Sequence, residues 1–224
     1  MSSARETCWT LIESAAHGAE PARDDFARRY LPVVRAYLFE RWRTSPFVGD
    51  VDDAIQEVFV ECFRAGGALT KVDPKRGFRP FLFGTVRNVA RRFEERFARR
   101  ASHKDSDSFH PESFANDEER LSVVFDKAWA GQIMREAAEQ MRLHARDAGA
   151  DAERRVELLV MRFQGDLPIR EIAKRWETDA AVLHHEYARA RNEFKQALLE
   201  VLAFHQPDAK AAERECQQLL DILS

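Results

Sequence analysis

Apolar residues recur at intervals of three and four along most of the chain, which is the spacing of one face of an α-helix. Glycines and runs of β-branched residues are few, and no segment alternates in the manner of a β-strand. We therefore predict an all-α protein. The first clear helix spans about residues 22–42, with Phe26, Tyr30 and Tyr37 on its apolar side. Pro32 lies inside this stretch and either kinks the helix or marks a helix start.

Two further helices follow in the first half of the chain. The second spans about residues 50–64, where Asp50 or Asp52 can cap free backbone N–H groups and the residues "AGG" end the helix. The third begins near Pro80, a residue type that suits the first turn, and its apolar positions Leu82, Val86 and Phe93 recur at helical spacing.

The charge pattern divides the chain into parts. Residues 105–126 carry seven acids and one arginine among Ser, His and Pro, without apolar periodicity, which is the composition of a linker. We predict two small helical domains, at 1–104 and 123–206, joined by an acidic flexible linker at 105–122. A helical extension is predicted at 207–224, and its apolar face would need another surface to pack against.

Length and composition limit the class of protein. The 224 residues are 33% charged and 45% hydrophobic, the net charge is −3, and no apolar run is long enough for a membrane span. The first residues resemble no export signal, so we expect a cytoplasmic protein. The three cysteines, Cys8, Cys62 and Cys216, have the spacing of neither a disulfide framework nor a zinc site, and Cys62 is expected to be buried.

The second domain contains a short helix, a turn and a long helix. The short helix is predicted at 169–176, the turn at 177–179, and the long helix continues to the residue before Pro207. This order is typical of a helix-turn-helix that places its second helix in the DNA major groove, although helical hairpins are also common in bundles. The start of the long helix has few cations, which predicts weak DNA affinity for this domain by itself.

Residues 71–100 are basic and aromatic. They carry ten Lys and Arg against three acids, with phenylalanines between them. Cations that bind phosphates and rings that stack on bases are what single-stranded or melted nucleic acid requires. The alternative is that Leu82, Val86, Phe93 and Phe97 form core and that the arginines are a solvated face. We expect that not all of Phe78, Phe81 and Phe83 can face one core.

The second helix carries several carboxylates on its outer side, and Asp53, Glu57 and Glu61 lie at four-residue steps. We expect this face to bind a basic protein partner rather than a metal ion. The sequence contains no glycine-rich phosphate loop, nucleophile elbow or zinc-peptidase motif. We therefore expect a protein without cofactor, metal or enzymatic activity.

Two stretches resemble a known family. "DVDDAIQEVFVECFRA" followed by "VDPKRGFRPFLFGTVRNVARR" resembles the second conserved region of extracytoplasmic-function (group IV) sigma factors, which belong to the sigma-70 family. "VMRFQGDLPIREIAKRWETDAAVLHHEYARARNEF" resembles the fourth region of the same family. The resemblance implies an alternative sigma factor that binds core RNA polymerase, through its clamp coiled coil and flap, and recognises and opens promoter DNA.

The resemblance also assigns residues. Those that would bind the polymerase clamp are Asp52, Asp53, Gln56 and Glu57. Those that would meet the −10 element and its melted strand are Phe78, Arg79, Phe81, Arg87, Asn88 and Arg91. Those that would face the −35 element or its backbone are His184, His185, Glu186, Arg189 and Arg191. Glu177 stands where the family has a turn glycine, and a non-glycine residue in the left-handed region costs about 1 kcal/mol.

Regulation by a partner is also implied. Family members are commonly held by an anti-sigma factor, and a subset with a similar N-terminal sequence is tied to serine/threonine kinases. Thr44 and Ser45, just before the acidic helix, are candidate phosphorylation positions because added negative charge would extend the acidic face. Two alternatives remain: a stand-alone helix-turn-helix regulator, and a protein-binding adaptor whose arginine face is buried within the chain.

Overall fold

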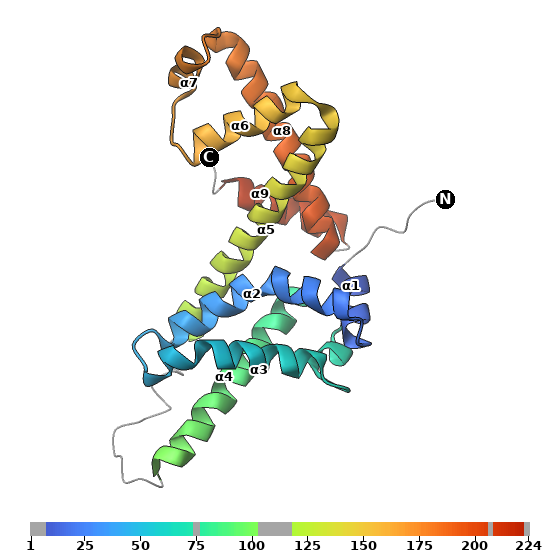
Figure 1. The fold of residues 1–224 in the computed structure, drawn as a ribbon, viewed down its shortest axis with the longest axis vertical. Helices are drawn as coiled ribbons and strands as arrows, with labels where there is room; N and C mark the ends of the chain where they lie inside the picture. The colour runs from blue at the N-terminus through green and yellow to red at the C-terminus, as the bar shows by residue number, and fades with distance from the viewer. Residues whose placement is uncertain (1–7, 74–76, 103–117, 206–207, 222–224) are drawn as a thin grey trace. The chain divides into compact units, whose positions relative to one another are not determined.

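The computed structural model describes residues 8–73, 77–102, 118–205 and 208–221, and every regular element in these ranges is helical (Figure 1). The prediction of an all-α protein is confirmed for this part of the chain. The α-helices are α1 (Cys8–Ala16), α2 (Glu20–Trp42), α3 (Val51–Phe63), α4 (Phe78–Ser102), α5 (Glu118–Ala148), α6 (Ala150–Phe163), α7 (Ile169–Arg175), α8 (Ala180–His205) and α9 (Ala209–Asp221). Two 3₁₀ turns, η1 (Pro46–Asp50) and η2 (Ala68–Lys71), flank α3.

The chain forms two compact units, residues 1–132 and 133–224. The division falls inside α5, so the first part of this helix belongs to unit 1 and the rest to unit 2. Residues 105–117 of the predicted linker lie outside the described residues. Residues 118–122, also expected to be linker, are instead the first turns of α5, because Leu121 is buried and anchors them in the core of unit 1.

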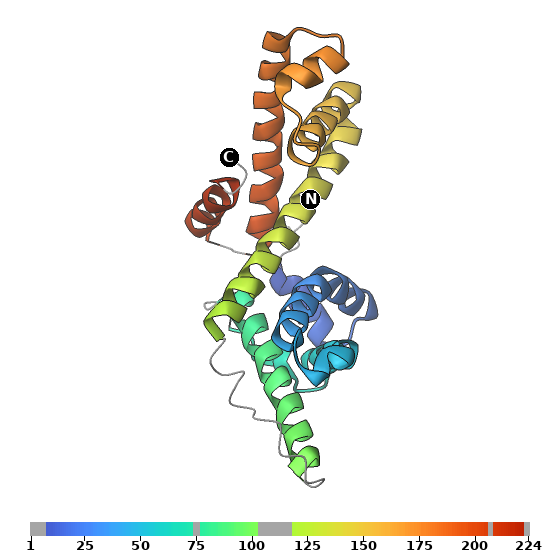
Figure 2. The ribbon, with the colours of Figure 1, turned by 90° about the vertical axis from the view of Figure 1, so that its left-hand side faces the viewer.

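Unit 1 is built on α2, which packs against α1, α3 and α4 (Figures 1 and 2). Pro32 lies within α2 and does not end it, since the helix continues from Glu20 to Trp42. The buried side of α2 follows the predicted stripe, with Phe26, Tyr30 and Tyr37 in the core. Aromatic rings therefore fill much of this unit and fix the helices against one another.

One buried ion pair joins α2 to α4. The Arg41 guanidinium donates two hydrogen bonds to the Glu94 carboxylate, at 2.7 and 2.9 Å, and both side chains are almost fully buried. Trp42 Nε1 donates to the same carboxylate at 2.7 Å, and Arg41 also donates to the hydroxyl of Tyr37. Burial raises the pKa of Tyr37. Each polar atom of this cluster thus depends on its neighbours for hydrogen bonds that water would otherwise supply.

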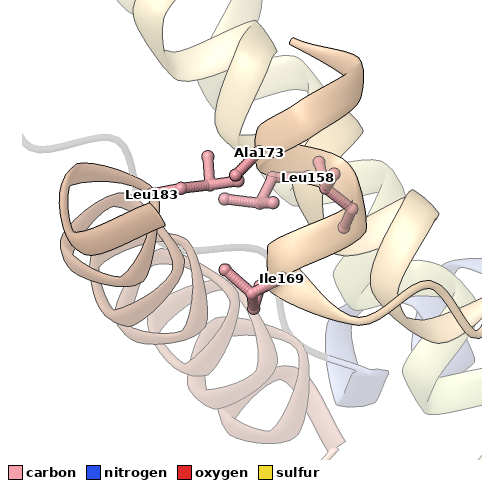
Figure 3. Packing of buried hydrophobic residues seen from close by; sticks show 5 residues of the cluster. Leu158, Ile169, Ala173 and Leu183 are labelled. Carbon is pink, nitrogen blue, oxygen red and sulfur yellow. The ribbon is translucent and has the colours of Figure 1, made fainter. Parts of the chain in front are cut away.

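Unit 2 has its core between α6, α7 and α8. Leu158, Ile169, Ala173 and Leu183 point toward one another in this core (Figure 3). α9 packs against α8 through Ala212, Cys216 and Leu219. The apolar face of the predicted extension is therefore covered by α8.

The cysteines are buried, as predicted for Cys62. Burial raises the pKa of Cys8 and of Cys62 to about 12, so both thiols stay protonated and behave as small apolar groups. None of the described helices is long and apolar enough to cross a membrane.

Replacing Glu94 tests the buried ion pair. We expect Glu94→Ala to lower the free energy of unfolding by about 3–5 kcal/mol, because it leaves the Arg41 charge buried without its partner. Urea denaturation followed by circular dichroism measures the change. Glu95→Ala, at the exposed neighbouring position, should change stability by less than about 0.5 kcal/mol. Equal effects of the two substitutions would contradict a structural role for the pair.

Candidate polymerase and nucleic-acid interface

The first turns of α3 present a polar surface. Asp52, Asp53 and Gln56 are exposed, while Val51, Ala54 and Ile55 face the core. Asp52 forms an ion pair with Arg35 of α2 at 2.7 Å, although its own side chain is 71% exposed. In the first turns of α3, the positions open to a partner are therefore those that the sequence analysis selected, apart from Glu57.

Glu57 is engaged within the chain. Arg96 of α4 donates two hydrogen bonds to its carboxylate, at 2.8 and 2.5 Å, and this contact holds the pKa of Glu57 below its usual value. Glu61, one turn further, accepts from Arg92 and Arg64. The lower part of the predicted acidic face is thus neutralised by α4, and Glu57 serves to join α3 to α4.

The aromatic residues at the start of α4 lie deeper than expected. Phe78 is fully buried among Phe26, Tyr30 and Trp129, so its ring offers no face to a nucleic-acid base in this structure. The structure does not support the expected contact of Phe78 with the −10 element, because the first residue of α4 packs its ring against Phe26 and Tyr30 in the core of unit 1. Phe81 and Phe83 are half-buried, which leaves part of each ring accessible.

Five arginines of α4, together with Asn88, fall into three sets. Arg92 and Arg96 bind the carboxylates of α3. Arg79 and Arg87 bind carboxylates of α5: Arg79 reaches Asp126 at 2.5 Å and Arg87 reaches Glu118 at 2.8 Å. Asn88 and Arg91 are exposed on the outward side of the helix, so they are the predicted nucleic-acid contacts that a ligand can reach directly.

Unit 2 holds the second set of predicted contacts. α7, a turn at residues 176–179 and α8 follow one another as the sequence predicted. Glu177 has φ of 50°, which places it in the left-handed region as expected for a residue at the position of a turn glycine. Asp179 Oδ1 accepts from the backbone N–H of Ala181 at 2.6 Å and caps α8.

The first two turns of α8 expose a mixed surface. His184, His185 and Arg189 are exposed, and so is Val182. An exposed valine beside the imidazoles suits contact with a thymine methyl group in a major groove.

Glu186, unlike its exposed neighbours on α8, is engaged in ion pairs within unit 2. The Glu186 carboxylate accepts from Arg155 of α6 and from Arg189, and Arg155 also binds Glu193 at 2.8 Å. Two acids of α8 are therefore neutralised from within unit 2, which reduces their repulsion of an approaching phosphate. Arg155 is a residue that sequence reasoning missed.

An apolar groove of about 580 Å³ lies within unit 2, between the second part of α5, α6 and α8. Arg191 lines this groove, so it lies on another side of α8 than His185. Met134, Met141, Val156, Leu159, Phe163 and Phe194 supply its apolar wall. The size and lining suit one apolar helix face of another protein.

Comparison with known families bears on unit 1. Residues 26–102 match the model of Sigma-70 region 2. Unit 1 therefore contains a sigma-70 region 2 domain. The match indicates a sigma-factor role in promoter recognition and RNA polymerase binding. No curated protein and no solved structure matched the chain in the other two comparisons.

The region 2 domain spans α2, α3 and α4, so the exposed polar surface of α3 and the outward side of α4 both belong to it. α1 and α5 lie outside the match, although both contribute to the core of unit 1. Val60, which is 63% exposed, extends the α3 surface by one turn beyond Gln56 and was not selected from the sequence. Within the described ranges, no three acidic, His or Cys side chains could hold a metal ion.

The two candidate phosphorylation positions before α3 differ in access. Thr44 is exposed, whereas Ser45 is buried and its Oγ accepts from the backbone N–H of Phe47, which caps η1. A kinase must reach the hydroxyl, and phosphate at Ser45 would break this cap. The structure thus disfavours Ser45 and leaves Thr44 as a prediction.

The strained turn before α8 gives a second prediction. Glu177→Gly should raise the free energy of unfolding by up to about 1 kcal/mol, because glycine adopts positive φ without a Cβ penalty. Thermal and urea denaturation would measure the gain. The matched control Glu171→Gly, in the helix α7, should lower stability by about 1 kcal/mol. A loss of stability in both variants would contradict the assigned strain.

Proposed function

We propose that this chain is an alternative sigma factor of the extracytoplasmic-function group, which binds core RNA polymerase, recognises −10 and −35 promoter elements and promotes DNA opening. The observation that supports the proposal most is the combination, in one chain, of a region 2 domain with an exposed acidic helix and a second unit with a short helix, a capped turn and a long helix. Each part then has a distinct partner.

The α3 surface would bind the polymerase clamp coiled coil. Asp52, Asp53 and Gln56 offer two carboxylates and an amide on one exposed side of a helix, which complements a basic helical partner. Exposed Val60 adds an apolar contact at the edge of the same surface. Glu57 would support this surface indirectly through its ion pair with Arg96.

The outward side of α4 would bind the −10 element and its melted strand. Asn88 and Arg91 are exposed and can meet phosphates and base edges, and the half-buried rings of Phe81 and Phe83 lie at the entrance of the helix. Arg79 and Arg87 can join them when their guanidiniums exchange a carboxylate for a phosphate, because both anions suit the same planar fork.

Unit 2 would act as the fourth sigma region. The start of α8 would enter the major groove of the −35 element through Val182, His184, His185 and Arg189. The apolar groove would take a helix of the polymerase flap, with Arg191 at its edge. The few cations at the start of α8 are acceptable because a polymerase-bound unit acts at high effective concentration.

The chain itself would catalyse no reaction. Polymerase would form the RNA, while this chain would choose the promoter and hold the opened bases, an activity located in the cytoplasm with the DNA. Control by a serine/threonine kinase is supported by the exposure of Thr44 just before α3. An anti-sigma factor is the alternative regulator, and it would compete for the same α3 surface.

A stand-alone helix-turn-helix regulator is the second candidate function, favoured by the exposed start of α8. It would leave the α3 surface without a role. Mixing the purified protein with core polymerase and a library of candidate promoters separates the two proposals. The sigma proposal requires that the promoter opens only when both components are present. Opening is measured by the permanganate reactivity of unpaired thymines. Binding to duplex DNA without polymerase, and no opening with it, would favour the regulator.

Charge reversal on α3 gives a third prediction. We expect Asp53→Lys combined with Gln56→Lys to weaken polymerase binding at least about tenfold, because it places cations against a basic partner. Fluorescence anisotropy with labelled protein and core enzyme measures the affinity. The control Asp24→Lys, at an exposed position of α2, should retain wild-type affinity. Unchanged affinity in the double variant would refute the α3 interface.

A further inference from the structure

We infer that residues 118–129 of α5 form an intrachain latch over the nucleic-acid side of α4, and that this latch must be displaced before Arg79 and Arg87 bind DNA. The inference rests on the proposed function, since it assigns an antagonist to the same surface. The latch lies within unit 1 and carries the two carboxylates that engage these arginines, Glu118 and Asp126.

The spacing of the ion pairs shows how well the two helices match. Arg79 and Arg87 are eight residues apart on α4, and Asp126 and Glu118 are eight residues apart on α5, paired in the opposite order. Eight residues of helix span roughly 12 Å, so two antiparallel helices bring both pairs into register. Positions 79, 83 and 87 share one side of α4, and the latch covers this side.

Apolar contacts hold the latch more strongly than the ion pairs do. Both ion pairs are partly exposed, and such pairs contribute little to stability. Leu121, Phe125 and Trp129 are buried, however. The Phe125 ring lies 5.2 Å from Phe83, and Trp129 stacks on Tyr30 at 5.8 Å, measured between ring centroids. The closed arrangement is therefore the stable one in the free chain.

The latch is an addition to the region 2 domain rather than part of it. Residues 118–129 lie outside the matched range 26–102, while Arg79 and Arg87 lie inside it. Asn88 and Arg91 stay exposed beside the closed latch, so DNA can make a first contact there. Phosphates that then displace Glu118 and Asp126 would leave the latch held by its apolar contacts alone and so favour its opening, which links the exposure of the arginines to the presence of melted DNA.

Removing the two carboxylates tests the latch. Anisotropy with a labelled single-stranded oligodeoxynucleotide of randomised sequence would compare the full-length Glu118→Gln/Asp126→Asn variant with wild type at low salt. We expect about tenfold tighter binding, because two competing anions are gone. The control Glu119→Gln/Asp147→Asn changes the net charge equally at exposed positions of α5 and should bind like wild type. Circular dichroism confirms that each variant is folded.

A second measurement follows Trp129 itself. In protein labelled with 5-fluorotryptophan, the Trp129 resonance, assigned with Trp129→Phe, should move when wild type is saturated with the same oligonucleotide. A resonance that stays unchanged in the bound state would overturn the latch.

The double variant Arg79→Gln/Arg87→Gln separates failure of the latch from failure of the proposed sigma function. If Arg79→Gln/Arg87→Gln weakens DNA binding but removal of the carboxylates does not strengthen it, the latch is refuted and the sigma function stands. If neither pair of substitutions alters binding and no promoter opens with core polymerase, both proposals fail.

Discussion

The buried ion pair between Arg41 and Glu94 sets the geometry on which the rest of unit 1 depends. It joins α2 to α4 where neither charge has access to water, and Trp42 and Tyr37 complete its hydrogen bonds. A bidentate pair of this kind tolerates little rotation of either helix, because a small shift would leave a buried charge without a partner. This contact fixes the rotation of α4 about its own axis. It thereby fixes the direction that each arginine of α4 faces.

Once α4 is fixed, its other charges divide by direction. One side meets the carboxylates of α3, another meets those of α5, and the third, with Asn88 and Arg91, stays open. A segment that looks uniformly basic in the sequence is therefore three surfaces with different tasks. The first holds the bundle together, the second is covered by a competing anionic helix, and the third is ready for a ligand. The same logic holds in unit 2, where Arg155 neutralises Glu186 and Glu193 on α8 while the histidines remain exposed.

In both units, a side-chain cap fixes the start of a helical segment beside the proposed contact residues. Ser45 and Asp179 each use a side-chain oxygen to bind a backbone N–H two residues later, one at η1 before α3 and the other at the start of α8. Both fix the entry of a helix whose exposed residues are candidate contacts. The left-handed residue Glu177 adds strain to the second of these entries, which is acceptable because the core of Leu158, Ile172 and Leu183 holds the turn in place.

The sequence by itself determined the all-α class, the order of the main helices and the burial of Cys62, since these follow from local periodicity. The position of Glu177 at a turn glycine came from the family resemblance. Asp52 and Asp53 were also visible in the pattern, because they are carboxylates on the outer side of an amphipathic helix, whereas Gln56 was selected only through the family resemblance. Only the tertiary structure decided that Phe78 is core, that Glu57 and Glu186 are engaged and that Ser45 is buried, since each depends on a partner distant in sequence. Only the tertiary structure, likewise, placed an acidic segment against Arg79 and Arg87. Periodicity shows which side of a helix is polar, but the choice between solvent, a partner and another part of the same chain is made by packing.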